Sequence, residues 1–162
     1  MKQIALTKGY VALVDDEDFE ELSQWKWRAL VKPRTVYAIR HSAGRRGGTI
    51  HMGRDILGIS LPVLTDHING NGLDNRRVNL RECTRQENNR NSRSRLGSSS
   101  RYLGVCWNKQ MQKWQAGIKV GGRLRHLGYF AVETEAGSAY KAAAAIAYGE
   151  FASGVRGCEE ED

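Results

Sequence analysis

The chain has 162 residues, 40% of them hydrophobic, and a formal net charge of +7. No apolar run reaches the roughly 18 residues of a membrane-spanning helix, and the N-terminal MKQIALTKGY lacks the apolar core of a signal peptide, so we expect a cytoplasmic protein without membrane contact. From Arg76 to Arg101 there are eight arginines and two acidic residues. This basic middle indicates a polyanionic partner, although charge alone equally fits a solvated surface.

Residues 1–60 are predicted to form a small β-rich supporting unit. Apolar residues alternate on both sides of Lys8 and Gly9, which is typical of a hairpin. Further strands are expected over residues 25–29, 35–40 and 49–52. Short helices are expected over residues 16–23 and from Arg54 to Gly58.

Residues 61–95 have the pattern strand, loop, strand, helix. A first strand over residues 61–68 leads to Asp66 and His67. The loop that follows is rich in Asn, Gly and Asp, which tolerate unusual backbone angles, and a second strand is expected over residues 78–84. Thr84 and Glu87 have the spacing of a capping box, which predicts a helix from Arg85 to about Arg93.

This segment contains the side chains that a phosphodiesterase with a single metal ion needs. His67 is a candidate base, and Asp66 beside it is a candidate anionic metal ligand. Asn88, one turn into the helix, can face His67. A lone Asp-His pair is more often structural, and Asn79 by itself is a turn residue, but the combination at this spacing favours catalysis.

Residues 96–100 end a stretch rich in serine, glycine and arginine that is typical of a linker. Residues 101–152 are predicted to form a three-stranded antiparallel sheet packed on one helix, and residues 153–162 an acidic tail. The strands are expected over residues 102–107, 114–120 and 123–130, with a two-residue turn at Gly121 and Gly122. The helix is expected to begin after an N-cap at Thr134 and to end before Gly149.

One face of this sheet is predicted to pack on the helix, through Trp114, Ala116, Ile118 and Val120 on the middle strand. The helix is expected to present Ala136, Ala139, Ala143 and Ala147 to the sheet. The opposite, cationic face either enters a DNA groove or is simply solvated. The candidate DNA contacts include basic residues from the nuclease segment and the linker as well as residues of this sheet. They are Arg76, Arg77, Arg90, Arg93, Arg95, Arg101, Lys109, Lys113, Gln115, Lys119, Arg123, Arg125 and His126.

The cysteines and histidines give no sign of a zinc site. Cys83, Cys106 and Cys158 are widely spaced and form no CxxC pair, so neither a zinc knuckle nor a disulfide framework is predicted. The four histidines contain no HxxxH pair, which argues against a zinc protease.

Two family resemblances cover most of the chain. DHINGNGLDNRRVNL followed by CTRQENNRN resembles the HNH nucleases of phages, especially intron-type homing endonucleases. RYLGVCW, QKWQAGIKV, RHLGYF and AGSAYKAAAAIAYGEFA resemble an APETALA2-type DNA-binding domain, and the N-terminal ALTKGYVALVDDEDFEELSQWKWRA resembles phage endonucleases that join both modules. The resemblance implies an α+β protein with a ββα-metal core at residues 61–95.

The resemblance also implies roles for individual residues. His67 matches the general base and Asn79 the central asparagine that braces the loop and helps to hold the histidine ring. Asp66 and Asn88 match the ligands of one Mg²⁺ or Mn²⁺ ion, with Asn89 and Asn91 as alternatives to Asn88. The implied activity is a DNA nick by a monomer or weak dimer without an organic cofactor.

Some positions depart from the resemblance, and two other functions stay open. Leu103, Cys106, Asn108 and Leu124 occupy positions where plant APETALA2 domains have arginines, so their GC-rich target is not carried over. The alternatives to a DNA endonuclease are a non-catalytic DNA-binding regulator and an RNA-directed nuclease.

Overall fold

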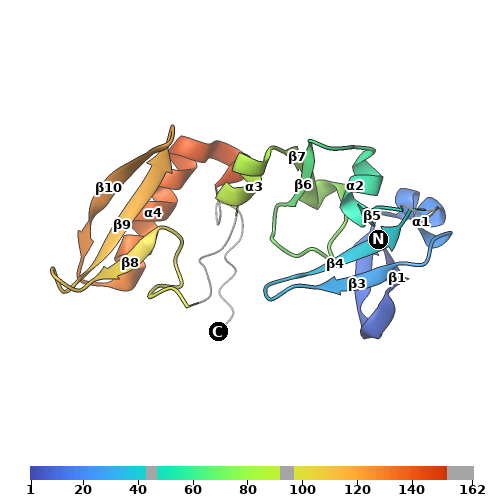
Figure 1. Ribbon diagram of the computed structural model, residues 1–162, viewed down its shortest axis with the longest axis horizontal. Coiled ribbons are helices and arrows are strands. Elements are labelled where there is room, and N and C mark those ends of the chain that lie inside the picture. The colour runs from blue at the N-terminus through green and yellow to red at the C-terminus, as the bar shows by residue number, and fades with distance from the viewer. Residues whose placement is uncertain (43–46, 92–96, 153–162) are drawn as a thin grey trace. The chain divides into compact units, whose positions relative to one another are not determined.

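The computed structural model describes residues 1–42, 47–91 and 97–152. It divides the chain into two compact units, residues 1–88 and residues 89–162. In the described residues, helices combine with small antiparallel sheets, which makes the protein a mixed α and β structure (Figure 1). None of the described helices is both long enough and apolar enough to span a bilayer.

The first unit opens with the expected hairpin. Strand β1 (Lys2–Ala5) pairs with β2 (Val11–Val14) across a short 3₁₀ turn, Thr7–Gly9. The side chains that enter the core from this hairpin are Ile4, Leu6, Ala12 and Val14. Helix α1 (Asp16–Ser23) follows as predicted, with acidic residues in its first turn that suit the helix dipole.

A three-stranded sheet comes next, in the order β3 (Arg28–Val31), β4 (Val36–His41), β5 (Thr49–His51). The strand expected over residues 25–29 begins only at Arg28. Trp27 instead turns into the core, 3% exposed, and its indole N–H donates to the Leu22 carbonyl at 2.8 Å. Helix α2 (Met52–Leu57) follows β5 directly and ends as predicted at Gly58, whose φ of 64° suits glycine.

The unit closes with a second hairpin and a short helix. Strand β6 (Leu64–His67) pairs with β7 (Leu80–Cys83). Strand β7 begins two residues later than predicted, and Val78 is exposed. The capping box is confirmed, because the Glu87 N–H donates to Thr84 Oγ1 and the Thr84 N–H donates to Glu87 Oε2. The helix that it starts, α3 (Arg85–Arg90), ends three residues before the expected Arg93.

One hydrophobic core joins this hairpin to the N-terminal strands and helices. It contains Ile4, Val14, Met52, Ile56 and Leu80 among others. Residues 1–60 therefore share a core with the hairpin that follows them, and Figure 1 shows α2 beside β6 and β7.

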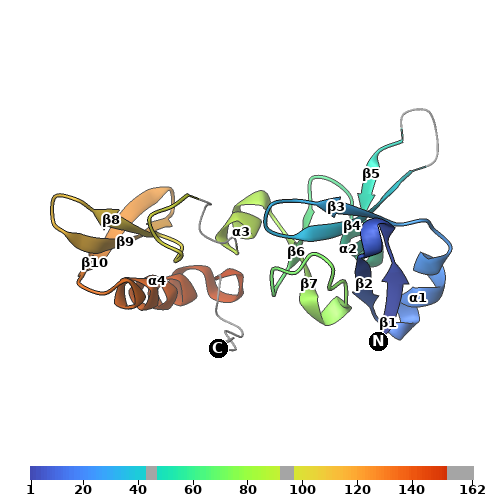
Figure 2. The same ribbon diagram turned by 90° about the horizontal axis from the view of Figure 1, so that it is seen from below.

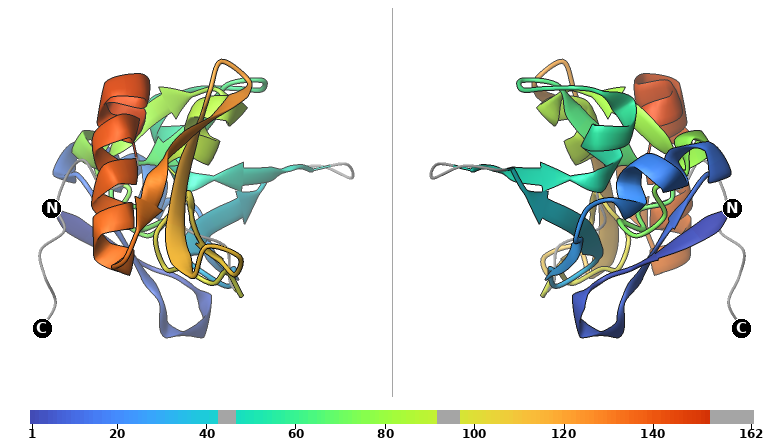
Figure 3. Two further views of the ribbon diagram at one scale, coloured as in Figure 1. Left: turned by 90° about the vertical axis from the view of Figure 1, so that its left-hand side faces the viewer. Right: turned by 90° about the vertical axis from the view of Figure 1, so that its right-hand side faces the viewer.

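The second unit is a sheet covered on one face by a helix, as predicted. The sheet order is β10 (Arg123–Phe130), β9 (Lys113–Val120), β8 (Val105–Asn108), all antiparallel. Gly121 and Gly122 form the β9–β10 turn, with φ of 58° and 80°, which only glycine adopts without strain. Figures 2 and 3 show α4 (Glu133–Tyr148) along one face of this sheet, and the short 3₁₀ helix Gly149–Phe151 follows it.

The face that α4 buries differs from the predicted alanine stripe. The buried residues are Ala136, Gly137, Tyr140 and Ala144, while Ala147 is exposed. The helix begins at Glu133 after Val132, so Thr134 is not its N-cap. The large Tyr140 ring fills the interface, and burial raises the pKa of its hydroxyl to about 12.

Candidate active site

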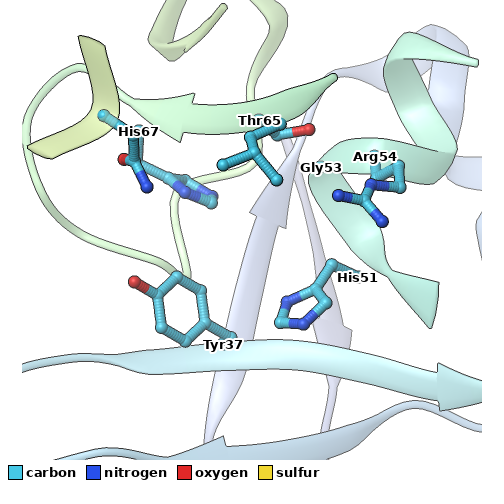
Figure 4. Close-up of a pocket in the computed structure, with 8 residues that line it drawn as sticks. Tyr37, His51, Gly53, Arg54, Thr65 and His67 are labelled. Atoms are coloured by element: carbon cyan, nitrogen blue, oxygen red, sulfur yellow. The ribbon is translucent and has the colours of Figure 1, made fainter. Parts of the chain in front are cut away.

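A pocket of about 260 Å³ lies in the first unit (Figure 4). The residues that line it come from β4, β5, α2, β6 and α3, and are Tyr37, His51, Gly53, Arg54, Leu64, Thr65, His67 and Asn88. The pocket thus brings together His67 and Asn88, as the sequence predicted, with side chains from the N-terminal half of the unit.

His67 reaches the pocket because side chains alternate along a strand, so that Thr65 and His67 share one face of β6. Its Nε2 lies 3.2 Å from Asn75 Oδ1. The Asn75 amide donates to the Gly72 carbonyl at 3.5 Å, which leaves Oδ1 to accept a hydrogen from Nε2. Nδ1 of the imidazole is then the basic nitrogen.

Burial sets the protonation state of His67. Desolvation lowers the pKa of the imidazole, and the Asn75 hydrogen bond together with the charges of Asp66 and Asp74 opposes this only in part. The ring is therefore neutral at neutral pH, which is the form that can accept a proton.

Asn75 is a site residue that the sequence reasoning missed. It is 1% exposed, and it makes the contact to the His67 ring that the resemblance implies for Asn79. In the sequence, Asn75 differs from the other loop residues only in its position in the Asp-Asn pair that closes a glycine-rich loop. Gly53 allows α2 to approach it, since a Cβ there would lie 3.3 Å from Asn75 Oδ1 and 3.0 Å from Leu80 Cδ2.

Asn79 braces the loop between the two strands. Its Nδ2 donates to the Asp74 carbonyl at 2.7 Å, and its Oδ1 accepts from the Asn69 N–H at 2.9 Å. Strand β2 supports the same loop, because the Leu13 N–H donates to the Leu73 carbonyl and the Asn75 N–H donates to the Leu13 carbonyl, both at 2.8 Å. The loop is therefore fixed from two sides.

Asp66 lies on the other side of β6 from the pocket residues Thr65 and His67, and is buried. Its carboxylate Oδ2 lies 2.6 Å from Arg81 Nη2 and 2.9 Å from Arg81 Nε. No sequence motif identifies Arg81. The strand register, which places Arg81 directly across from Asp66, is the signal that identifies it.

The donors expected for a divalent metal ion are chemically suitable. A carboxylate from Asp66 and an amide oxygen from Asn88 are hard ligands that suit Mg²⁺ or Mn²⁺. Asn88 lines the pocket, whereas Asn89 and Asn91 do not. Within residues 1–42, 47–91 and 97–152, no group of three or more His, Cys, Asp and Glu side chains forms a metal cluster. A hard cation at Asp66 would therefore draw further ligands from water or phosphate, and would compete with Arg81.

Two arginines expected to contact DNA make ion pairs within the first unit. Arg76 donates from Nε and Nη2 to the Asp74 carboxylate, each at 2.7 Å, and these bonds lower the pKa of Asp74. Arg77 Nη2 lies 2.6 Å from Asp18 Oδ1, and Arg77 Nε lies 3.0 Å from Glu17 Oε1. Both arginines therefore hold the loop in place.

The remaining candidate DNA contacts belong to the second unit. Arg93 and Arg95 lie outside the described residues. The Arg90 and Arg101 guanidinium groups stack over the rings of Tyr148 and Tyr102, and Gln115 is half-buried and accepts a hydrogen bond from Asn108 at 3.1 Å. The exposed candidates are Lys109, Lys113, Lys119, Arg123, Arg125 and His126.

The strand register sorts these exposed residues between the two faces of the sheet. Leu124 pairs with Lys119 and His126 pairs with Gly117, on the face away from α4. Arg123 and Arg125 alternate with them and so point to the helix side. Leu124 is 73% exposed, and the His126 ring packs 4.6 Å from that of Tyr129. The outer face is thus partly apolar and aromatic as well as basic.

The end of the first unit is similar to a known protein family. A model described as HNH endonuclease matches residues 64–90, which span β6, the loop, β7 and α3. No curated protein and no solved structure matches the chain. The matched segment supports a nuclease, a hydrolase of a class that acts on DNA and generally uses a divalent metal ion.

Proposed function

We propose that the protein is a metal-dependent DNA endonuclease of the homing type that nicks one strand of a duplex. The observation that carries the proposal is the pocket shared by His67 and Asn88, which lies within the segment that matches HNH endonucleases. Strands β6 and β7 with α3 then act as a ββα-metal core, and the supporting strands of residues 1–60 complete its pocket.

His67 acts as the general base in this proposal. Its neutral imidazole, oriented by Asn75, accepts a proton from the water that attacks the phosphodiester. Asp66 and Asn88 would hold one Mg²⁺ or Mn²⁺ ion once the Asp66 carboxylate leaves Arg81 and turns toward the pocket that Asn88 lines, and the ion would supply charge neutralisation at the phosphate and the leaving 3′ oxygen. Asn79 keeps the loop and therefore Asn75 in place.

The second unit binds the duplex, in the manner of an APETALA2-type domain. Its outer sheet face offers Lys119 to phosphates, and Leu124, His126 and Tyr129 to the groove. The net charge of +7 favours this association. One site per chain suits a monomer or weak dimer that nicks, and the resemblance of both modules points to a phage protein acting in the host cytoplasm.

The test is nicking of supercoiled plasmid by the full chain. We expect open-circular product with Mg²⁺ or Mn²⁺ and none with EDTA, because the phosphodiester needs charge neutralisation at the leaving oxygen. DNA retained on a gel without any nicking, at every divalent metal tried, would contradict an endonuclease.

One observation favours a second candidate, a non-catalytic DNA-binding regulator. The Asp66 carboxylate is buried and already neutralised by Arg81, as it would be if the metal site had been lost. The same plasmid assay separates the two functions, because a regulator binds the plasmid in the presence of Mg²⁺ and leaves it supercoiled.

A further inference from the structure

Two buried side-chain atoms, on residues that line the pocket, have no hydrogen-bond partner in the described structure. They are Arg54 Nε and Thr65 Oγ1, and both residues line the pocket beside His67. A buried polar group without a partner costs free energy, so each such group in a folded protein calls for an explanation, and a bound ligand is one.

The Arg54 side chain is held in place by a hydrogen bond to the backbone. Its Nη2 donates to the Val63 carbonyl at 3.3 Å, which fixes the guanidinium at the pocket wall. Arg40, another arginine of the same unit, donates from Nε and Nη2 to the Asp55 carboxylate. Arg54 thus bonds to a backbone carbonyl, whereas Arg40 bonds to a carboxylate. None of the described residues that line the pocket of Arg54 carries a carboxylate.

His51 adds a second imidazole to the same wall. Figure 4 shows the His51 and His67 rings and the Arg54 guanidinium directed toward one space. Burial, and then the charge of Arg54, lower the pKa of His51, so its neutral ring offers one N–H donor. Burial raises the pKa of Tyr37, whose hydroxyl therefore stays protonated and is a further donor.

We propose that Arg54, Thr65 and His51 form a phosphate-binding subsite for the DNA backbone, beside His67. Arg54 supplies a positive charge, and Thr65 and His51 supply neutral hydrogen-bond donors. A phosphodiester is complementary to them, because its phosphate group is negatively charged and its oxygens only accept hydrogen bonds. The proposal rests on the proposed nuclease function and deepens it, because it gives the N-terminal sheet and α2 a direct part in substrate binding.

Binding can be tested without cleavage, using inorganic phosphate and the full chain in EDTA. We expect phosphate to shift the NMR signals of the His51 imidazole, and Arg54→Gln to weaken this binding by about tenfold or more, the effect of losing a charge-assisted hydrogen bond. Arg28→Gln removes an exposed β3 arginine and is the matched control. Equal phosphate binding by wild type and Arg54→Gln, or His51 signals that do not move, would overturn the subsite.

Cleavage kinetics on a short duplex provide the second measurement. Arg54→Gln and Thr65→Val should raise KM, by about tenfold for Arg54→Gln, while Arg28→Gln should not. Arg54→Lys keeps the charge, and a melting curve of each variant identifies any that fails to fold. If phosphate binds at His51 but the protein never nicks DNA, the subsite is supported and the nuclease function is contradicted. If the protein nicks DNA and Arg54→Gln leaves KM unchanged, the nuclease function is supported and the subsite is contradicted.

Discussion

The two units bury different kinds of side chain. In the first unit the buried polar residues are Asp18, Asp66, Asp74, Asn75 and Asn79, whereas in the described part of the second unit Ser100 is the only one. The second core is built from Val105, Ala116, Ile118, Tyr140 and other apolar residues, and its charges face solvent. A polar interior costs stability unless every group is paired, which is reasonable where side chains must be held in one orientation. The difference teaches that the first unit is organised to position reactive groups and the second to present a surface.

Removing His67 should give the largest effect and tests whether the polar interior serves chemistry. His67→Ala should lower the nicking rate by about 10²–10⁴-fold, because the base is lost, while the melting temperature changes little. The rate is measured on supercoiled plasmid with Mg²⁺. His41→Ala, an exposed histidine at the end of β4, is the control, and a His67→Ala protein as fast as wild type would remove His67 as the base.

Removing Arg81 tests whether Asp66 binds metal. Arg81→Met leaves a buried carboxylate without its cation and should reduce the free energy of unfolding by about 3–5 kcal/mol in EDTA. Mg²⁺ should restore more stability to this variant than to wild type, because the metal replaces the lost cation. Urea denaturation with and without Mg²⁺ measures both.

The control for this experiment is Arg85→Met, which removes an exposed arginine from the first turn of α3. If Mg²⁺ stabilises Arg81→Met no more than wild type and Arg85→Met, Asp66 is not a ligand. The buried Asp66–Arg81 ion pair would then have only a structural role.

The Asp74–Arg76 pair should make the first unit sensitive to acid. Because the pKa of Asp74 is lowered in the folded state, its stabilisation is present above the unfolded value of about 3.9 and is lost as the pH falls through the folded pKa. Arg76 is partly exposed, so we expect Asp74→Asn to cost only about 1 kcal/mol at pH 7. The gap between wild type and Asp74→Asn in urea denaturation should close at low pH, and a gap that widens there would be inconsistent with this pair.

The smallest effect is expected at the surface of the second unit. Lys119→Ala should weaken DNA binding and reduce the slope of log K against log salt by about 0.9, which corresponds to one phosphate contact. Lys141→Ala, on an exposed turn of α4, should leave the slope unchanged. Binding curves at several salt concentrations decide the matter, and identical slopes for Lys119→Ala and wild type would exclude this face of the sheet as the DNA contact.

Several elements followed from local rules in the sequence. The N-terminal hairpin, the capping box of Thr84 and Glu87, the helix end at Gly58 and the turn at Gly121 and Gly122 each depend on residues that are neighbours in the chain. The predictions failed where a distant contact competes with a local preference. Trp27 precedes β3 and packs its side chain into the core, although a strand was expected there. On α4, Tyr140 is buried against the sheet together with only some of the expected alanines.

The sequence by itself determined the candidate residues Asp66, His67 and Asn88, because their spacing around a strand, a loop and a capped helix is a local property. Only the tertiary structure decided what surrounds them. Asn75 reaches the His67 ring through a loop that β2 holds, and Arg54 and His51 join the pocket from elements that precede β6 in the chain. Such contacts depend on how separate segments pack in one core, and no residue spacing along the chain encodes that packing directly.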